Sequence, residues 1–495
     1  MIHSIRTNNF WNNSYSKKDL KQNIVLMILV DFCIFLIFFV NQYSRLDFKK
    51  YDMYSKSLVQ ALSKGEVFIS NTPNTDKLDK LNDPYDTIER EKIDRTTDYI
   101  WDAAYFNGKY YVYFGALPAI LIMVPYYLIT KKLLQTSTVV LLFSLMSIPI
   151  IEMLTKKIFE KFFKKLPFKY MFASIIMMLI GTMLIWINVA PRYYELVIVA
   201  GFFFALLGFL LIFEIDLDNI KYKNVFLGCG SLALSVACRP TQIFSSLLII
   251  PLLFKIIKVA KNKKSIVKIL FSIIIPYLII VILLMSYNYL RFNNPFEFGE
   301  KYQLTINNMK ELSLRWILLP TGILCNLFGL PVFQANFPFI QTNANIIDTF
   351  SYYYVEDMPG GVFIFAPICF VIFGIFKFLK SCKNKDLKIF VTTLLIVGLI
   401  FVSFVSLKAG STGRYLLDFS WLFVLCGIVI FMEIINNLQT NEGRKILEKV
   451  LNIIVCYTII INLLSSFCII GGINSIKNNS PKQYYETEYM IMFLK

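Results

Sequence analysis

The amino-acid sequence predicts an all-α integral membrane protein with about eleven transmembrane helices. Three observations lead to this fold class. Hydrophobic residues make up 56% of the 495 residues and charged residues only 17%, whereas a soluble protein has about 25% charged residues. The apolar residues form runs of about 20, the helix length that crosses a hydrocarbon core of about 30 Å. Lysines collect in short segments between these runs, as in the cytoplasmic loops of membrane proteins.

The first apolar run covers residues 23–42 and follows a polar, basic N-terminus. It is longer than the apolar part of a cleaved signal peptide, and no small-residue cleavage site follows it. We therefore expect this run to be a signal anchor and residues 1–22 to be a cytoplasmic N-terminus. Asp31 lies midway along this helix, where we expect it to pair with a polar group of another helix.

Eleven further apolar runs follow, and one of them has to stay out of the membrane. They cover residues 113–130, 136–155, 170–190, 194–214, 225–238, 241–257, 269–289, 361–379, 388–406, 415–436 and 449–471. If every run crossed, the basic loop 156–169 would lie outside, against the rule that lysine-rich loops stay in the cytoplasm. The run 113–130 contains Pro118 and Pro125 and opens with tyrosines, which favours a helix lying on the outer membrane surface.

With that run outside, the orientation of the other segments follows. The lysine-rich loops then all face the cytoplasm: 156–169, 255–268, 377–388 and 437–449. The polytopic domain covers residues 23–471, and residues 472–495 form an outer C-terminal tail. The outer face carries two long loops, 43–135 and 290–360, together with the short loop 407–414. Long loops of this kind are usually functional, so we look for the chemistry there.

Composition also excludes several functions. The net charge of +17 follows from helix orientation and does not indicate a nucleic-acid partner. The nine cysteines include no CxxC pair and lie mostly within apolar runs, so neither a disulfide framework nor a zinc site is predicted. The single histidine, His3, argues against a Ser-His-Asp triad or a histidine-ligated metal. Isolated carboxylates in the outer loops permit a divalent cation but do not require one.

The first outer loop holds candidate catalytic residues. Asp86 follows a Pro-Tyr pair in a turn, where its simplest role is to accept hydrogen bonds from nearby backbone amides. Asp102 stands next to Trp101 and precedes an aromatic segment near the membrane, where a carboxylate is partly removed from water and suited to general-base catalysis. Lys109 lies in the same stretch. Two carboxylates and a lysine beside an interfacial aromatic helix together predict a site.

Arginines stand at the outer ends of several apolar runs. Arg192 belongs to a very short outer turn, and Arg239 interrupts an otherwise continuous apolar stretch. Arg414 opens a later helix, with Asp418 spaced to share its face. Arginines at the outer face can clamp a phosphate or pyrophosphate through bidentate hydrogen bonds. The alternative is that they extend to the membrane interface or form internal ion pairs.

Taken together, these features resemble the polytopic GT-C glycosyltransferases, a group that includes protein mannosyltransferases and aminoarabinose transferases. In those enzymes a first helix precedes a long extracytoplasmic loop with a catalytic Asp and juxtamembrane helices. Several short stretches look like an uncharacterised bacterial branch of the group. They are the segment from Asn82 to Pro125, Cys238-Arg239-Pro240-Thr241, Arg291-Phe292-Asn293-Asn294-Pro295-Phe296-Glu297-Phe298-Gly299 and Gly413-Arg414-Tyr415.

The resemblance implies a multi-pass enzyme of the cell membrane that acts on the cell envelope. Its donor would be a sugar linked to a polyprenyl phosphate or diphosphate, and its acceptor a lipid, a glycan or a protein. The acceptor would attack the anomeric carbon of a hexose or pentose with inversion, and an Asp would serve as general base.

Carried onto this chain, the resemblance assigns roles to specific residues. No acidic pair follows the first helix directly, because Asp47 and Asp52 stand singly there. The base therefore remains open between Asp52, Asp86 and Asp102, of which the last two fit the loop better. The donor phosphate would be held by Lys109, Arg239 and Arg414.

Two other classes of function compete with the enzyme. A polytopic transporter or lipid flippase would have no transferase chemistry. Transporters of this kind are often built from inverted repeats with charges near the membrane midplane. This chain has no convincing internal repeat, and its charges lie at the outer edge. A noncatalytic membrane scaffold would leave the acidic, aromatic outer loop without a role.

Overall fold

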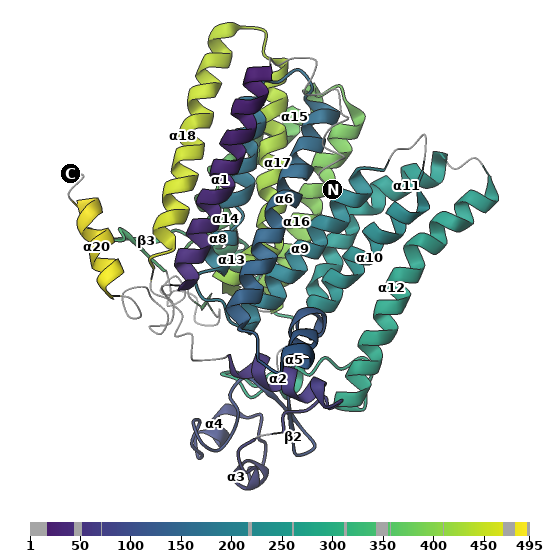
Figure 1. Ribbon diagram of the computed structural model, residues 1–495, viewed down its shortest axis with the longest axis vertical. Coiled ribbons are helices and arrows are strands. Elements are labelled where there is room, and N and C mark those ends of the chain that lie inside the picture. The colour runs from purple at the N-terminus through teal and green to yellow at the C-terminus, as the bar shows by residue number, and fades with distance from the viewer. Residues whose placement is uncertain are drawn as a thin grey trace.

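The computed structural model is a bundle of long helices with a small domain of loops and short elements at one end (Figure 1). It describes residues 17–43, 52–70, 72–215, 220–259, 262–310, 314–342, 355–356, 358–408, 410–468 and 481–492. The bundle consists of α1 (Lys17–Tyr43), α6 (Thr136–Phe162), α7 (Phe168–Ile180), α8 (Leu184–Ile187), α9 (Tyr193–Phe213), α10 (Tyr222–Cys238), η3 (Pro240–Ile249), α11 (Ile250–Val259), α12 (Lys263–Phe292), α14 (Val362–Phe365), η7 (Pro367–Gly374), α15 (Ile375–Ser381), α16 (Lys385–Lys408), α17 (Leu416–Asn437) and α18 (Asn441–Ser465).

Eight helices within the described residues are long and apolar enough to cross a membrane. The protein is therefore mostly helical and multi-pass, while the predicted count of eleven is not confirmed. Each of the eleven predicted runs falls on a helix, but three fall short of a full span. In α1 the apolar stretch is Val25–Phe39, α10 has 17 residues, and the run 361–379 is broken. The break lies before Pro367, where Ala366 leaves the helical conformation because the residue before a proline is sterically restricted.

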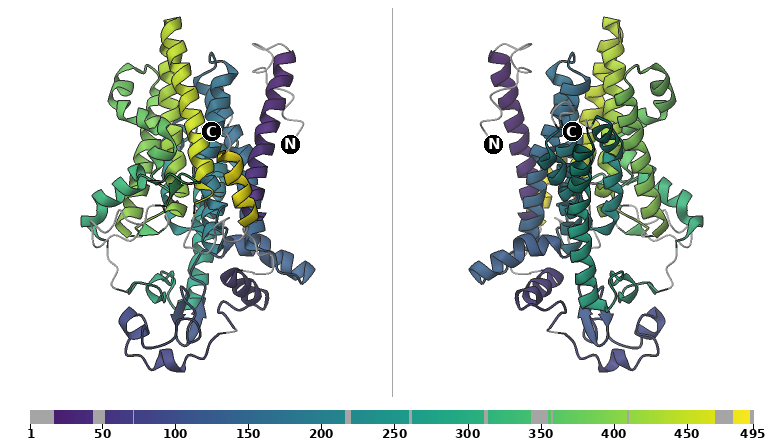
Figure 2. Two further views of the ribbon diagram at one scale, coloured as in Figure 1. Left: turned by 90° about the vertical axis from the view of Figure 1, so that its left-hand side faces the viewer. Right: turned by 90° about the vertical axis from the view of Figure 1, so that its right-hand side faces the viewer.

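The lysine-rich loops gather at one end of the bundle, opposite the two long loops (Figures 1 and 2). Ion pairs connect the segments at this end, including Lys157 with Glu214 at 3.5 Å and Lys255 with Asp386. This arrangement agrees with the loop assignment derived from charge. The assignment of the two ends to cytoplasm and exterior stays a prediction.

The run 113–130 forms η2 (Ala119–Met123) and α5 (Val124–Thr130), too short to span a membrane. It lies at the loop end of the bundle, and one end of this segment projects sideways from the bundle (Figure 2). Ile129 at its tip is 82% exposed, which suits a helix resting on an apolar surface. In the first helix, the carboxyl group of Asp31 has the carboxyl group of Glu152 of α6 as its polar neighbour.

The loop-end domain combines parts of both long loops. From the first loop come α2 (Met53–Ser63), α3 (Asp76–Asp79), α4 (Thr87–Arg90), β1 (Ala104–Phe106) and β2 (Lys109–Tyr111). Strands β1 and β2 form an antiparallel hairpin whose turn, Asn107-Gly108, has two positive φ angles. A residue of the second loop, Gln303, pairs with Ala104 in an isolated bridge. The second loop therefore completes the sheet of the first.

The predicted outer loop 290–360 is more structured than the sequence suggested. It contains η4 (Glu300–Tyr302), η5 (Trp316–Leu318), α13 (Leu319–Phe328), β3 (Val332–Phe333), β4 (Ile340–Gln341) and β5 (Val355–Glu356). Helix α13 packs against α16. Strand β5 pairs with β6 (Ser411–Thr412), which precedes η8 (Gly413–Tyr415) at the start of α17. The last described element is α20 (Pro481–Met492).

Candidate active site

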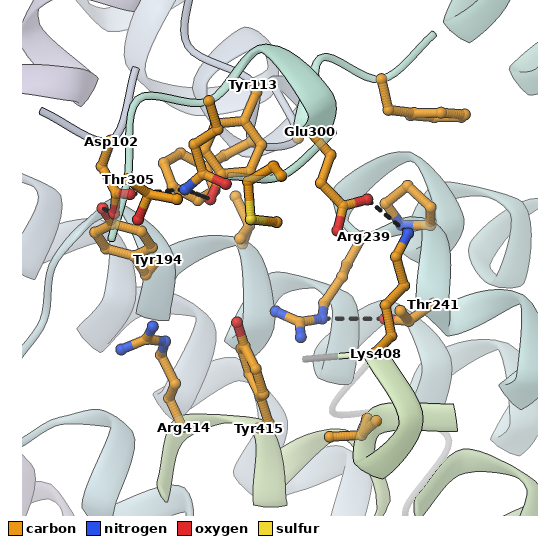
Figure 3. Close-up of a pocket in the computed structure, with 18 of the residues that line it drawn as sticks. Asp102, Tyr113, Tyr194, Arg239, Thr241, Glu300, Thr305, Lys408, Arg414 and Tyr415 are labelled. Atoms are coloured by element: carbon orange, nitrogen blue, oxygen red, sulfur yellow. Dashed lines mark hydrogen bonds and ion pairs between the residues drawn. The ribbon is translucent and has the colours of Figure 1, made fainter. Parts of the chain in front are cut away.

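A cavity of about 1120 Å³ lies where the bundle meets the two long loops. Its walls come from both loops and from the ends of four long helices of the bundle, α9, α10, α12 and α16, together with the start of η3 and with η8. Three of the six residues that were assigned a catalytic or binding role from the sequence line it, namely Asp102, Arg239 and Arg414. Figure 3 shows the carboxylate of Asp102 on one side of this cavity and the two guanidinium groups pointing into it.

Contacts from distant parts of the chain hold Asp102 in place. Its backbone has φ of 60°, a left-handed conformation that Asp tolerates better than most residues. Its backbone N–H donates to the carbonyl of Leu304 at 2.9 Å. Its carboxylate accepts hydrogen bonds from the Tyr194 hydroxyl and from Nε2 of Gln303, the latter at 2.7 Å. The carboxylate is therefore oriented by α9 and by the second loop together.

The hydrogen-bond network around Asp102 extends to Tyr113. Nε2 of Gln303 also donates to the Tyr113 hydroxyl, at 2.7 Å. Burial raises the pKa of Tyr113 well above its usual value, and the nearby Asp102 charge acts in the same direction. Tyr113 therefore remains a neutral hydroxyl that can donate a hydrogen bond into the cavity.

Two arginines flank Tyr415, and the guanidinium carbon of Arg414 also lies 5.0 Å from the ring centre of Tyr194. Nε of Arg239 lies 2.9 Å from the carboxylate of Asp418 and 3.0 Å from the Thr241 hydroxyl, and its guanidinium carbon lies 4.4 Å from the Tyr415 ring centre. Arg414 stacks over the same ring at 5.3 Å. Because Asp418 and Thr241 engage the Nε side of Arg239, its terminal nitrogens face the cavity (Figure 3).

The other three candidates do not line this cavity. Asp86 caps α4, where its carboxylate accepts from the Ile88 N–H at 2.9 Å. Asp52 caps α2 and also accepts from the Tyr193 N–H at 3.3 Å, and burial raises its pKa. Lys109 is exposed on β2 and lies over the Phe68 ring at 4.3 Å. These three residues have structural contacts outside the cavity, whereas Asp102, Arg239 and Arg414 line the same cavity.

Several cavity residues were not assigned a role from the sequence. The further cations are Arg95, Arg192, Arg291, Arg315 and Lys408, and the further acid is Glu300. Lys408 pairs with Glu300 at 2.6 Å, which joins the end of α16 to the second loop. Arg192, Arg291 and Lys408 stand at the junction of an apolar run with an outer loop, a position that could have marked them. Arg95 and Gln303 have no such signal, because only tertiary contacts bring them to the cavity.

The cavity does not assemble a ligand set for a divalent cation. Among the residues that the structure describes, no group of three or more His, Cys, Asp or Glu side chains could hold a metal ion. The cavity carboxylates already have partners, Tyr194 and Gln303 for Asp102 and Lys408 for Glu300.

No protein-family model and no curated protein sequence matches this chain. Among solved structures, ArnT from Cupriavidus metallidurans bound to undecaprenyl phosphate matches over 90% of this chain and 76% of its own, at 10% identity and a TM-score of 0.41. The oligosaccharyltransferase AglB from Archaeoglobus fulgidus, in complex with an inhibitory peptide and a dolichol-phosphate, matches over 91% of this chain at 11% identity and a TM-score of 0.48.

This chain spans 56% of the AglB structure, so about half of that protein has no counterpart here. Both matched proteins are GT-C glycosyltransferases, the group that the sequence resembles. TM-scores below 0.5 at about 10% identity do not fix an activity. The functional proposal therefore depends on the chemistry of the site itself.

Proposed function

We propose that this protein is a membrane glycosyltransferase that moves a sugar from a polyprenyl-phosphate-linked donor to an acceptor at the outer membrane face. One observation carries the proposal: an oriented carboxylate, Asp102, and two arginines, Arg239 and Arg414, line one cavity at a bundle end. A base and cations in one cavity are the groups that transfer from a phosphate leaving group requires.

The apolar part of the cavity supports a lipid-linked donor. Apolar residues continue the cavity wall from the arginines along the bundle: Ile243, Phe244, Leu284, Leu318 and Phe404. Ile243 is 45% exposed, and Leu284 belongs to α12, a helix on which many apolar side chains are exposed. A ligand with an anionic head and a long hydrocarbon chain fits this combination, with the head at the arginines and the chain toward lipid.

The chemistry follows from the positions of the charged groups. The acceptor hydroxyl attacks the anomeric carbon of the sugar while its proton passes to the carboxylate of Asp102. The bond between the anomeric carbon and the phosphate oxygen breaks, and its electron pair leaves with the polyprenyl phosphate. Arg239 and Arg414 stabilise the negative charge that develops on that phosphate. Attack from the side opposite the leaving group inverts the anomeric centre.

The test is sugar transfer by the purified protein in lipid nanodiscs. Undecaprenyl-phosphate sugars, labelled in the sugar, are offered one at a time with membranes of the source organism as acceptor. We expect the label to move to a new product, and Asp102→Asn to lower the rate by about 10²- to 10⁴-fold, the usual contribution of a general base. Asp76→Asn is the matched control, because Asp76 is exposed on α3 and contacts Asn74 only locally.

Two outcomes would contradict the proposal. Full transfer by Asp102→Asn would remove this residue from the mechanism. Movement of intact labelled lipid across the bilayer of sealed liposomes that contain the protein, with the sugar–phosphate bond unbroken for every donor, would instead identify a flippase.

A further inference from the structure

A third arginine of the cavity, Arg291, differs in its surroundings from the other two. It lies on the last turn of α12 and is only 4% exposed. Its Nη1 donates to the carbonyl of Val112 at 2.9 Å, and its Nη2 donates to Oδ1 of Asn288 at 2.7 Å. Both acceptors are neutral. These bonds attach α12 to the aromatic segment of the first loop, but they do not neutralise the guanidinium charge.

No carboxylate forms an ion pair with Arg291 among the described residues. The acid that acts on it electrostatically is Glu297. Glu297 itself pairs with Lys301 at 2.8 Å and accepts from the Gly299 N–H at 2.7 Å. By contrast, the charge of Arg239 is matched by the fully buried carboxylate of Asp418. A buried cation without a counter-ion is unfavourable, and a bound anion would relieve this.

Two polar atoms beside this charge lack hydrogen-bond partners. Nε of Arg291 and the hydroxyl of Tyr287 are both buried without a partner. The guanidinium carbon of Arg291 lies 4.1 Å from the Tyr287 ring centre, so the two groups are adjacent. Both residues, together with Asn288, line the cavity. Buried polar groups are almost always hydrogen-bonded in native proteins, and these two donors lack only an acceptor.

We propose that Arg291 and Tyr287 form a second anion subsite of the cavity, which takes a phosphate-type oxyanion. This rests on the proposed function in one respect: the donor phosphate occupies the first subsite, at Arg239 and Arg414. A phosphate oxyanion accepts hydrogen bonds from both a guanidinium and a hydroxyl group and supplies the missing negative charge. It would come from a second phosphate of the donor, a polyprenyl diphosphate, or from a phosphate on the acceptor.

The experiment measures binding to the full-length protein in nanodiscs with three probes: undecaprenyl phosphate, undecaprenyl diphosphate and inorganic phosphate. Tyr287→Phe is the test variant, because it removes only the unpartnered hydroxyl and keeps the ring. Tyr289→Phe is the matched control on the same helix, where the side chain is 57% exposed. Arg291→Lys is the second test variant, which keeps the charge but loses the fork of donors.

Two results would support the subsite and identify its ligand. If it takes the second donor phosphate, the diphosphate binds at least about tenfold more tightly than the monophosphate, and Tyr287→Phe removes most of this advantage. If it takes an acceptor phosphate, the two lipids bind equally, while inorganic phosphate binds to protein saturated with undecaprenyl phosphate and Tyr287→Phe weakens that binding. Tyr289→Phe changes neither measurement.

The proposal is overturned if neither a diphosphate advantage nor inorganic phosphate binding is observed. It is also overturned if Tyr287→Phe and Arg291→Lys both bind every probe as the unmodified protein does. Inorganic phosphate is tested on unloaded protein as well. If the unmodified protein does not bind undecaprenyl phosphate but binds inorganic phosphate in a way that depends on Tyr287, the proposed donor is contradicted and the subsite is supported.

Discussion

Both ends of the helix bundle are rich in basic residues, but the two ends use them differently. At the end opposite the cavity, Lys169 pairs with Glu448 at 2.6 Å and is 58% exposed in its side chain, and Lys255 pairs with Asp386. These cations stand on the surface and are balanced by surface acids. At the cavity end, arginines face a concave space, and Arg291 is buried with no acid partner among the described residues.

This difference shows that positive charge alone does not mark a binding site. An exposed lysine is well hydrated and gains little from a surface ion pair, about 0–1 kcal/mol. A guanidinium group is more weakly hydrated and presents a planar fork of donors, so it is better suited to a partly desolvated site. We therefore interpret the lysine end as setting helix orientation and the arginine end as the place where the proposed ligand binds.

The largest expected effect separates the two ends directly. Arg414→Ala should weaken binding of undecaprenyl phosphate by roughly 10- to 150-fold, because hydrogen bonds to a charged group contribute about 1.5–3 kcal/mol. Lys255→Ala, at the other end, should leave that affinity unchanged within about twofold. Binding is measured on both variants in nanodiscs of the same lipid. Equal losses in the two variants would show that the ligand responds to overall charge rather than to the cavity.

A second comparison lies within the cavity end, between two aspartates of the same loop. Asp86→Ala removes the cap of α4 and should lower stability by about 1 kcal/mol, the usual value of an N-cap side chain. Sugar transfer should persist, because Asp86 does not line the cavity. Thermal unfolding and the transfer assay are measured on the same preparation. Loss of transfer with an unchanged unfolding temperature would return Asp86 to the catalytic candidates.

The fate of these two aspartates shows what the sequence could and could not predict. Locally they look alike, since each follows aromatic residues in an acidic loop. What distinguishes them is distance along the chain: the partners of Asp102 are Tyr194, 92 residues away, and Gln303, 201 residues away. Asp86 bonds to Ile88, two residues on. A local sequence pattern does not predict which distant loop will pack against a given turn.

The same reasoning explains the arginines and the helices. The spacing of Arg414 and Asp418 predicted a shared helix face, but Asp418 pairs with Arg239 of another segment. Helices were predictable because the membrane requires a continuous apolar run, which is a local property. Helix α13, buried against α16 inside a loop region, was not predicted, because its apolar stretch of Trp316–Phe328 is too short to read as a span.

The smallest expected effect concerns two acids of the loop-end domain whose pKa values shift in opposite directions. Burial raises the pKa of Asp52 above its ordinary value of 3.8, so this residue stabilises the fold below that pH and the contribution is lost as pH rises through the folded pKa. The backbone N–H of Asp94 and the Lys77 ammonium lower the pKa of Asp98, so its contribution is present above 3.8 and lost as pH falls.

Unfolding temperatures measured from pH 3 to pH 7 on Asp52→Asn and Asp98→Asn should therefore change slope in opposite senses. Asn at position 52 keeps an oxygen that can cap α2, so Asp52→Asn should lose less stability than the unmodified protein as pH rises. Asp98→Asn should lose less as pH falls. Parallel slopes for the two variants would contradict the opposite environments of these carboxylates.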